Sequence, residues 1–146
     1  MRFSYIVTFC LLLVASCTVQ KQNTLPPVYG KIWEMQYISG IRIAFDGLYP
    51  DRKPYIAFDK DAGMVSGNTG CNGYSAPFTL HADSISFGEP GPSTLMYCGE
   101  GEKTFLDMMQ RVNRYAIDSA GNLELLMNEV MIMRFSPQGN TENQQK

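Results

Sequence analysis

Residues 55–66, with the sequence YIAFDKDAGMVS, contain two short apolar stretches on either side of a polar turn. Residues 55–58 and 64–66 each have the length and the aromatic or β-branched content of a strand. Residues 59–63, between them, are of types that favour turns. We therefore predict an antiparallel hairpin at this point of the chain.

Similar patterns lie on both sides of the hairpin. Upstream, polar and apolar residues alternate over 31–38 and 41–45, as in half-buried strands. Residues 67–74 are rich in glycine and asparagine, which predicts a tight, irregular loop. Further short strands are predicted downstream at 78–81, 84–87, 115–117, 123–127 and 131–135.

One segment has the period of a helix. Phe105, Met108, Met109 and Val112 are spaced i, i+3, i+4 and i+7, which gives a helix over 102–114 one apolar face. Packing against a core is the simplest role for this face. The predicted fold class is therefore α+β, a curved and mainly antiparallel β-sheet with one packed α-helix.

We expect a targeting segment in the first residues of the sequence. Arg2 precedes an apolar stretch over 5–15, which is too short to cross about 30 Å of hydrocarbon as a helix. It ends in Val14-Ala15-Ser16-Cys17, which resembles the lipobox of bacterial lipoproteins. We expect cleavage between Ser16 and Cys17 and lipid on Cys17. The alternative is an ordinary secretory signal followed by a chance cysteine.

These features predict the organisation of the whole chain. Residues 1–16 are a signal peptide, 17–30 a lipidated tether stiffened by Pro26-Pro27, 31–136 the folded domain and 137–146 a disordered tail. The predicted location is the cell envelope. Because no acidic retention signal follows Cys17, we expect an outer-membrane anchor, facing the periplasm or the cell surface.

Length and charge limit the classes of function. A chain of 146 residues is the size of one domain, and we expect a monomer. The formal net charge is −2, and removal of the signal peptide with Arg2 makes it −3. There is no basic cluster, so we expect no nucleic-acid partner.

The sequence has four cysteines, of which two would remain as thiols after signal-peptide cleavage and lipidation. Cys10 lies in the predicted signal peptide and Cys17 is the predicted lipidation site, which leaves Cys71 and Cys98. An even pair in an exported chain favours a disulfide. Two buried free thiols or a catalytic thiol are the alternatives. With His81 as the only histidine, a metal site lacks ligands, and we expect no metal and no cofactor.

The order of several motifs resembles the META domain family, which includes the HslJ lipoproteins. The resemblance covers about 31–135, and the two cysteine motifs are its most specific part. Ala76-Pro77 and Tyr97 depart from the family pattern, which has a glycine and a small residue there. The similar segments are Trp33-Glu34-Met35, 55–59, 65–74 with Gly67-Asn68-Thr69-Gly70-Cys71-Asn72, Ser93-Thr94-Leu95-Met96-Tyr97-Cys98, 102–106, 122–125 and 131–135.

The resemblance implies that Cys71 and Cys98 form a structural bridge, in an α+β domain of about this size. The family brings no accepted catalytic residues, and it is linked only loosely to envelope stress and secretion. From the sequence itself, no motif of a hydrolase, nucleotide-binding or calcium-binding site is present.

We therefore predict a non-enzymatic, lipid-anchored protein that binds an envelope protein or a small ligand. The alternative is a redox factor or enzyme that uses the thiols of Cys71 and Cys98. Two triplets, Asp83-Ser84-Ile85 and Asp118-Ser119-Ala120, match a bacterial O-glycosylation pattern. Ser84 and Ser119 are therefore candidate modification sites, although so short a pattern also occurs by chance.

Overall fold

The computed structural model of the chain describes residues 26–93 and 96–138. The predicted signal peptide, the lipidation site Cys17 and most of the tether lie outside the described residues. So do Thr94, Leu95 and residues 139–146 of the predicted tail.

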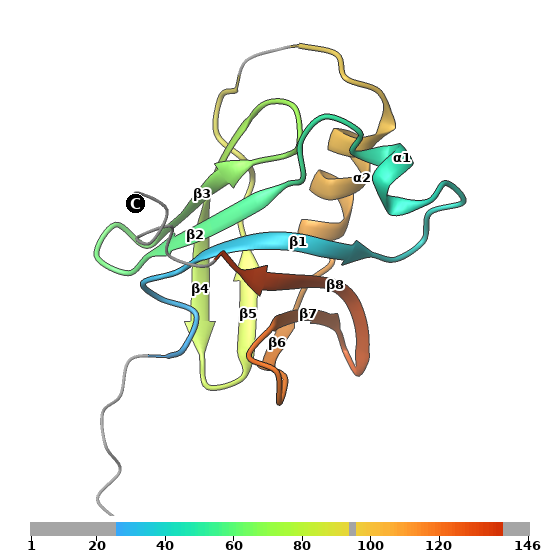
Figure 1. Cartoon of the computed structure of the whole chain (residues 1–146). Coiled ribbons are helices and arrows are strands. Elements are labelled where there is room, and N and C mark those ends of the chain that lie inside the picture. Colours follow the sequence, from blue (N-terminus) through green and yellow to red (C-terminus); the bar gives the residue numbers. More distant parts are fainter. Residues whose placement is uncertain (1–25, 94–95, 139–146) are drawn as a thin grey trace, which may run out of the picture.

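Within these residues, eight antiparallel strands form a closed barrel (Figure 1). Each strand pairs with the next along the chain, and the last returns to the first, with Met35 opposite Phe135. Closure removes the free edges that an open sheet would have. The strands are β1 (Ile32–Ile38), β2 (Tyr55–Asp59), β3 (Met64–Asn68), β4 (Gly73–His81), β5 (Ser84–Phe87), β6 (Arg114–Ile117), β7 (Leu123–Met127) and β8 (Val130–Pro137).

The predicted α+β fold class, with one helix on a curved sheet, is therefore wrong. The protein is mostly β, and its described helices are short: α1 (Phe45–Leu48) and α2 (Glu100–Met109). Alternating polarity identifies a strand and its buried face, but it does not say which strand pairs with which. Closure depends on pairing between β1 and β8, at opposite ends of the domain, and on Ser84 of β5 lying opposite Arg114 of β6.

The segment 41–45, predicted as a strand, turns instead into α1. Gly40 has a φ of 77°, a conformation that favours glycine, and the chain bends after it. Ile43, in the middle of the predicted strand, is 54% exposed. Its apolar character therefore does not reflect a buried strand face.

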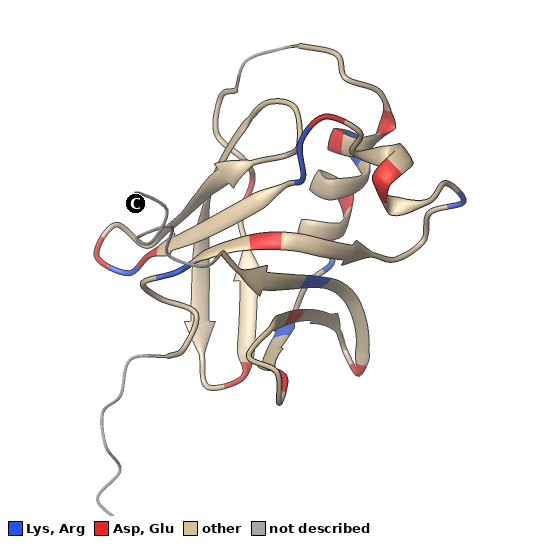
Figure 2. Ribbon diagram, in the orientation of Figure 1, with Lys and Arg blue, Asp and Glu red and all other residues tan. Residues whose placement is uncertain are grey.

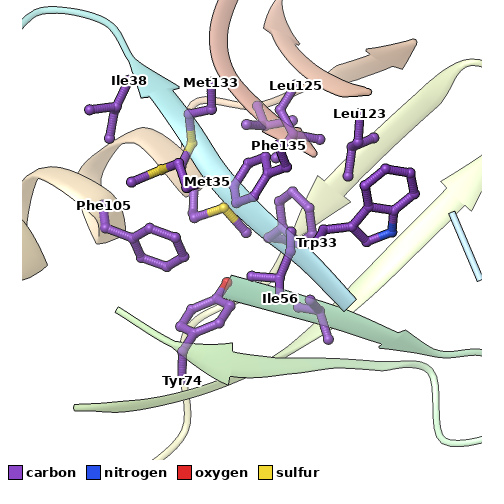
Figure 3. Packing of buried hydrophobic residues seen from close by; sticks show 14 of the residues in the cluster. Trp33, Met35, Ile38, Ile56, Tyr74, Phe105, Leu123, Leu125, Met133 and Phe135 are labelled. Carbon is purple, nitrogen blue, oxygen red and sulfur yellow. The ribbon is translucent and has the colours of Figure 1, made fainter. Parts of the chain in front are cut away.

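Helix α2 starts two residues before the predicted helix and ends earlier, at Met109. Arg114, predicted as the last helical residue, is already the first residue of β6. The predicted apolar face does point to the core, since Phe105 and Met109 are fully buried. The Phe105 ring points into the barrel and packs edge-on against Tyr74, with ring centroids 5.2 Å apart (Figure 3).

A bulge in β1 sets which side chains of this strand enter the barrel. Trp33 and Met35 are both buried, as strand alternation requires, and they lie close together in Figure 3. The pairing with β8 then shifts register between Met35 and Tyr37. As a result Ile38 points inward, whereas Tyr37 is 39% exposed.

The folded part begins before β1. The indole Nε1 of Trp33 donates a hydrogen bond to the carbonyl of Val28 at 2.8 Å, and the Val28 side chain is fully buried. The domain therefore starts at Val28, three residues before the predicted boundary at residue 31.

Candidate functional site

The loop between β3 and β4 folds back on itself. The side-chain oxygen of Asn68 accepts a hydrogen bond from the N–H of Gly70 at 2.7 Å, and the N–H of Thr69 donates to the carbonyl of Asn72 at 2.9 Å. Gly70 has a φ of 94°, and a Cβ there would lie 2.7 Å from the ring of Tyr49. The predicted tight loop is confirmed, although both flanking strands extend into it.

Cys71 and Cys98 connect this loop to the segment before α2. Their Cα atoms are 5.8 Å apart and their sulfur atoms lie at disulfide distance, with 27 residues of sequence separation. Cys71 is partly buried and Cys98 is exposed. This is the pairing that the sequence favoured over two free thiols.

A polar network centred on Glu102 of α2 makes a second connection. Its Oε2 accepts a hydrogen bond from Nδ2 of Asn72 at 2.7 Å, and its Oε1 accepts one from the Thr69 hydroxyl at 3.0 Å. The Asn72 amide also donates to the carbonyl of Met96 at 2.7 Å and accepts from its N–H at 3.2 Å. Because Thr69 and Asn72 are almost fully buried, their polar atoms need such partners. The network fixes the backbone at Met96.

Beside this network lies a groove of about 810 Å³ between α2 and the segment that leads into it. Pro90, Pro92 and Leu106 contribute apolar surface to its walls. Met96 and Tyr97 also line it, although their side chains are 60% and 85% exposed. Sites for small ligands usually have volumes of about 300–1,000 Å³, so the groove is large enough to hold one.

The charged residues of the groove are mainly acidic. Glu100 and Glu102 lie in the first turn of α2, where the helix dipole favours carboxylates (Figure 2). Lys103 forms an ion pair with Asp107, one turn further along the helix. Among the described residues, no lysine or arginine forms an ion pair with Glu100 or Glu102. The groove therefore has a net negative charge.

The two candidate glycosylation sites lie on the surface, away from the groove. Ser84 opens β5, and its hydroxyl donates to the carbonyl of Asn113 at 3.3 Å. Its neighbour Asp83 pairs with Arg114 at 2.6 Å, and this hydrogen bond lowers the pKa of the Asp83 carboxyl. Ser119 is exposed in the turn between β6 and β7. Modification of either serine stays a prediction.

The remaining candidate residues do not gather at one place. His81 is exposed at the end of β4. The Asp59 carboxylate accepts the N–H groups of Asp61 and Ala62, both at 3.0 Å, and so closes the β2–β3 turn. In the part of the chain that the structure describes, no group of three or more His, Cys, Asp or Glu residues could hold a metal ion.

Neither the groove nor the role of Glu102 was predicted from the sequence. A glutamate at the start of a helix is accounted for by the helix dipole, and the sequence around it gives no reason to expect partners in a loop about 30 residues away. One signal was available: Met96 and Tyr97 directly precede a bridged cysteine, so the bridge would hold two large side chains at the surface.

The profile of the META domain family matches residues 26–140, most of the chain. The chain belongs to the META domain family. Its match begins close to Val28, where the packed part of this META domain also begins. No curated protein matches the chain.

A similar fold is found in a solved structure described as the NMR structure of the protein from Burkholderia xenovorans. The TM-score is 0.61 at 19% sequence identity, and the likeness covers 79% of this chain and 90% of the other. At this identity it supports the fold of the META domain alone. The described part of the chain contains no helix with the length and hydropathy needed to span a membrane.

Proposed function

We propose that this META domain belongs to a lipid-anchored protein of the outer membrane, and that it binds an envelope partner through the groove without being an enzyme. The targeting segment and Cys17 support the anchor. The groove supports the binding role, because it joins a large apolar surface to a few polar groups at fixed positions.

The observation that carries the proposal is that Met96 and Tyr97 are exposed although their backbone is held in place. The Asn72 side chain forms hydrogen bonds with both the carbonyl and the N–H of Met96. Cys98, directly after Tyr97, is bridged to Cys71. A surface that is already ordered loses little conformational entropy on binding. Exposed tyrosines of this kind often dominate the energy of an interface.

The position of the groove suits a partner that approaches from the side away from the anchor. In Figure 1 the chain enters the domain at one end, and the segment that leads into α2 lies at the other. The 11 residue steps from Cys17 to Val28 span at most about 40 Å even when fully extended. The groove would therefore be accessible to a partner while the domain stays close to the membrane.

The alternative function, a thiol-dependent redox factor or enzyme, requires a reactive thiolate. Two cysteines joined in a disulfide have no free thiolate, which argues against this alternative. The polar side chains beside the bridge connect the loop to α2, which is a structural role. We expect a maleimide reagent to label neither cysteine in unreduced protein from the envelope. Labelling of either one would support the redox alternative.

The anchor is tested by cell fractionation. We expect the native chain in the membrane fraction and Cys17→Ala in the soluble fraction, since lipid on Cys17 would hold the protein to the membrane. A Cys17→Ala chain that stays in the membrane fraction would contradict the lipid anchor.

The groove is tested in living cells with a photoreactive amino acid placed at Tyr97 or at Asp61, an exposed residue of the β2–β3 turn. We expect a discrete crosslinked product from position 97 and none from position 61. Equal products from both positions, or none from position 97, would contradict binding in the groove.

A further inference from the structure

The carboxylates of Glu100 and Glu102, which line the groove, indicate which kind of partner it can bind. Lys103 forms an ion pair with Asp107 and also attracts Glu100 through its charge, but one lysine cannot balance the three carboxylates that line the groove. The Glu102 carboxylate accepts two hydrogen bonds from uncharged groups, which stabilise it without cancelling its charge. Glu100 is exposed at the edge of the groove. A cationic group on the partner would complement this pair.

The aromatic ring of Tyr97, which lines the groove, also favours a cationic group. Tyr97 is 85% exposed, so most of its surface is open to solvent, and it lies three residues before Glu100. Cations attract the face of an aromatic ring, and arginine does so most often. The domain uses this contact elsewhere: Lys31 lies 5.2 Å from the ring centroid of Trp33, and Lys53 lies 5.8 Å from that of Phe45.

The apolar walls of the groove indicate which groups would lie beside the cation. Pro90, Pro92 and Leu106 offer no charge and favour aliphatic groups on each side of the cation. A guanidinium is planar and weakly hydrated, so it can stack on a ring and pair with a carboxylate at the same time, which an ammonium does less well. An anionic phosphate or lipid headgroup would be repelled by both glutamates.

We infer that the groove binds a protein segment in which an arginine is flanked by aliphatic residues, with the guanidinium against Tyr97 and beside Glu100 and Glu102. The inference rests on the proposed function, since it assumes that the groove is the binding site. It adds the class of partner, a basic and apolar protein segment.

The test measures binding of the full chain in uncharged detergent to three short peptides with an uncharged fluorophore. They are Gly-Leu-Arg-Leu-Gly and the same peptide with citrulline or glutamate in place of arginine. Citrulline keeps the shape of arginine and removes its charge. We expect the arginine peptide to bind about tenfold more tightly than the citrulline peptide, and the glutamate peptide to bind most weakly. This preference should shrink when salt rises from about 0.1 M to about 1 M.

Two variants locate the contact. Tyr97→Ala and Glu100→Gln should each weaken binding of the arginine peptide by about threefold to fivefold. Both side chains are exposed, so neither change should disturb the fold, and the thermal unfolding midpoint checks this. Tyr37→Ala on β1 and Asp61→Asn in the β2–β3 turn are the matched controls and should bind as the native chain does.

Equal binding of the arginine and citrulline peptides, or a preference for the glutamate peptide, would overturn the inference. So would equal losses in the groove variants and the controls, which would indicate adsorption to micelles or to another surface. The proposed function is judged separately. A crosslink from position 97 in cells together with no arginine preference would leave the groove as a binding site and exclude this class of partner.

Discussion

Asn72 and Glu102, 30 residues apart in the sequence, are joined by a hydrogen bond of 2.7 Å between Nδ2 and Oε2. The bond connects the β3–β4 loop to the first turn of α2. Through the same amide, Asn72 also holds both backbone groups of Met96. One buried side chain therefore sets the positions of three segments around the groove.

We expect Glu102→Gln to lower the free energy of unfolding by about 1–2 kcal/mol, because charge-assisted hydrogen bonds to Asn72 and Thr69 become neutral ones. Chemical denaturation measures the change. Glu100→Gln removes an equal charge from the same helix turn and is the control, with an expected loss of about 0.5 kcal/mol or less. Equal losses in the two variants would mean that the network contributes no more than the helix dipole does.

We expect the double substitution Cys71→Ser and Cys98→Ser to lower the free energy of unfolding by about 3.5 kcal/mol. The bridge closes a loop with a sequence separation of 27 residues, and its removal increases the entropy of the unfolded chain. Denaturation of the native chain with and without a reductant gives the comparison. The reductant should destabilise the native chain and leave the serine variant unchanged; a serine variant as stable as the oxidised chain would contradict a stabilising bridge.

Tyr74 and Tyr49 are both buried, but their hydroxyl groups differ. The Tyr49 hydroxyl donates to the carbonyl of Gly101 at 2.8 Å, whereas the Tyr74 hydroxyl has no hydrogen-bond partner among the described residues. We expect Tyr49→Phe to lower the free energy of unfolding by about 1 kcal/mol, and Tyr74→Phe to leave it unchanged or raise it slightly. Thermal unfolding of both variants checks this. A larger loss for Tyr74→Phe would mean that its hydroxyl has a stabilising partner.

Several strands could be predicted from the sequence because the polarity pattern of their own residues is enough to identify them. The 55–66 hairpin lies where the alternation and the turn residues put it, with Ile56 and Phe58 pointing inward. Phe105 and Met109 gave the buried face of α2 in the same way. In each of these elements, short-range spacing decides the conformation and the buried side.

The barrel and the groove could not be predicted because they depend on contacts between distant segments. Nothing near Met35 specifies Phe135 as its neighbour, and nothing near Glu102 specifies Asn72. The bulge after Met35 also breaks the alternation, so Ile38 rather than Tyr37 is buried. At Ile43 the alternation predicted a strand where none forms, and its side chain lies exposed before α1.

Gly67 in β3 and Gly73, the first residue of β4, offer a matched test of how closely β2 and β3 approach. A Cβ on Gly67 would lie 1.9 Å from the carbonyl oxygen of Tyr55, whereas a Cβ on Gly73 would have no atom within 4 Å. We expect Gly67→Ala to lower the free energy of unfolding by about 2–4 kcal/mol, because backbone atoms of β2 would have to move. Gly73→Ala should change it by about 0.5 kcal/mol or less. Similar denaturation midpoints for the two variants would contradict this packing.

The ion pair between Asp83 and Arg114 should make stability depend on pH. The hydrogen bond from the Arg114 guanidinium, together with its charge, holds the pKa of Asp83 below the usual value of about 4. The folded state then binds this proton less readily than the unfolded state, so the stabilisation is fully present above about pH 4. It is lost as the pH falls through the lowered pKa of the folded state. We expect Asp83→Asn to be less stable than the native chain at neutral pH, and the difference to disappear once the pH lies below the lowered pKa of Asp83. Urea denaturation across this range measures the difference, and Asp61→Asn is the control. A difference between Asp83→Asn and the native chain that stays constant down to low pH would show that the ion pair is not its cause.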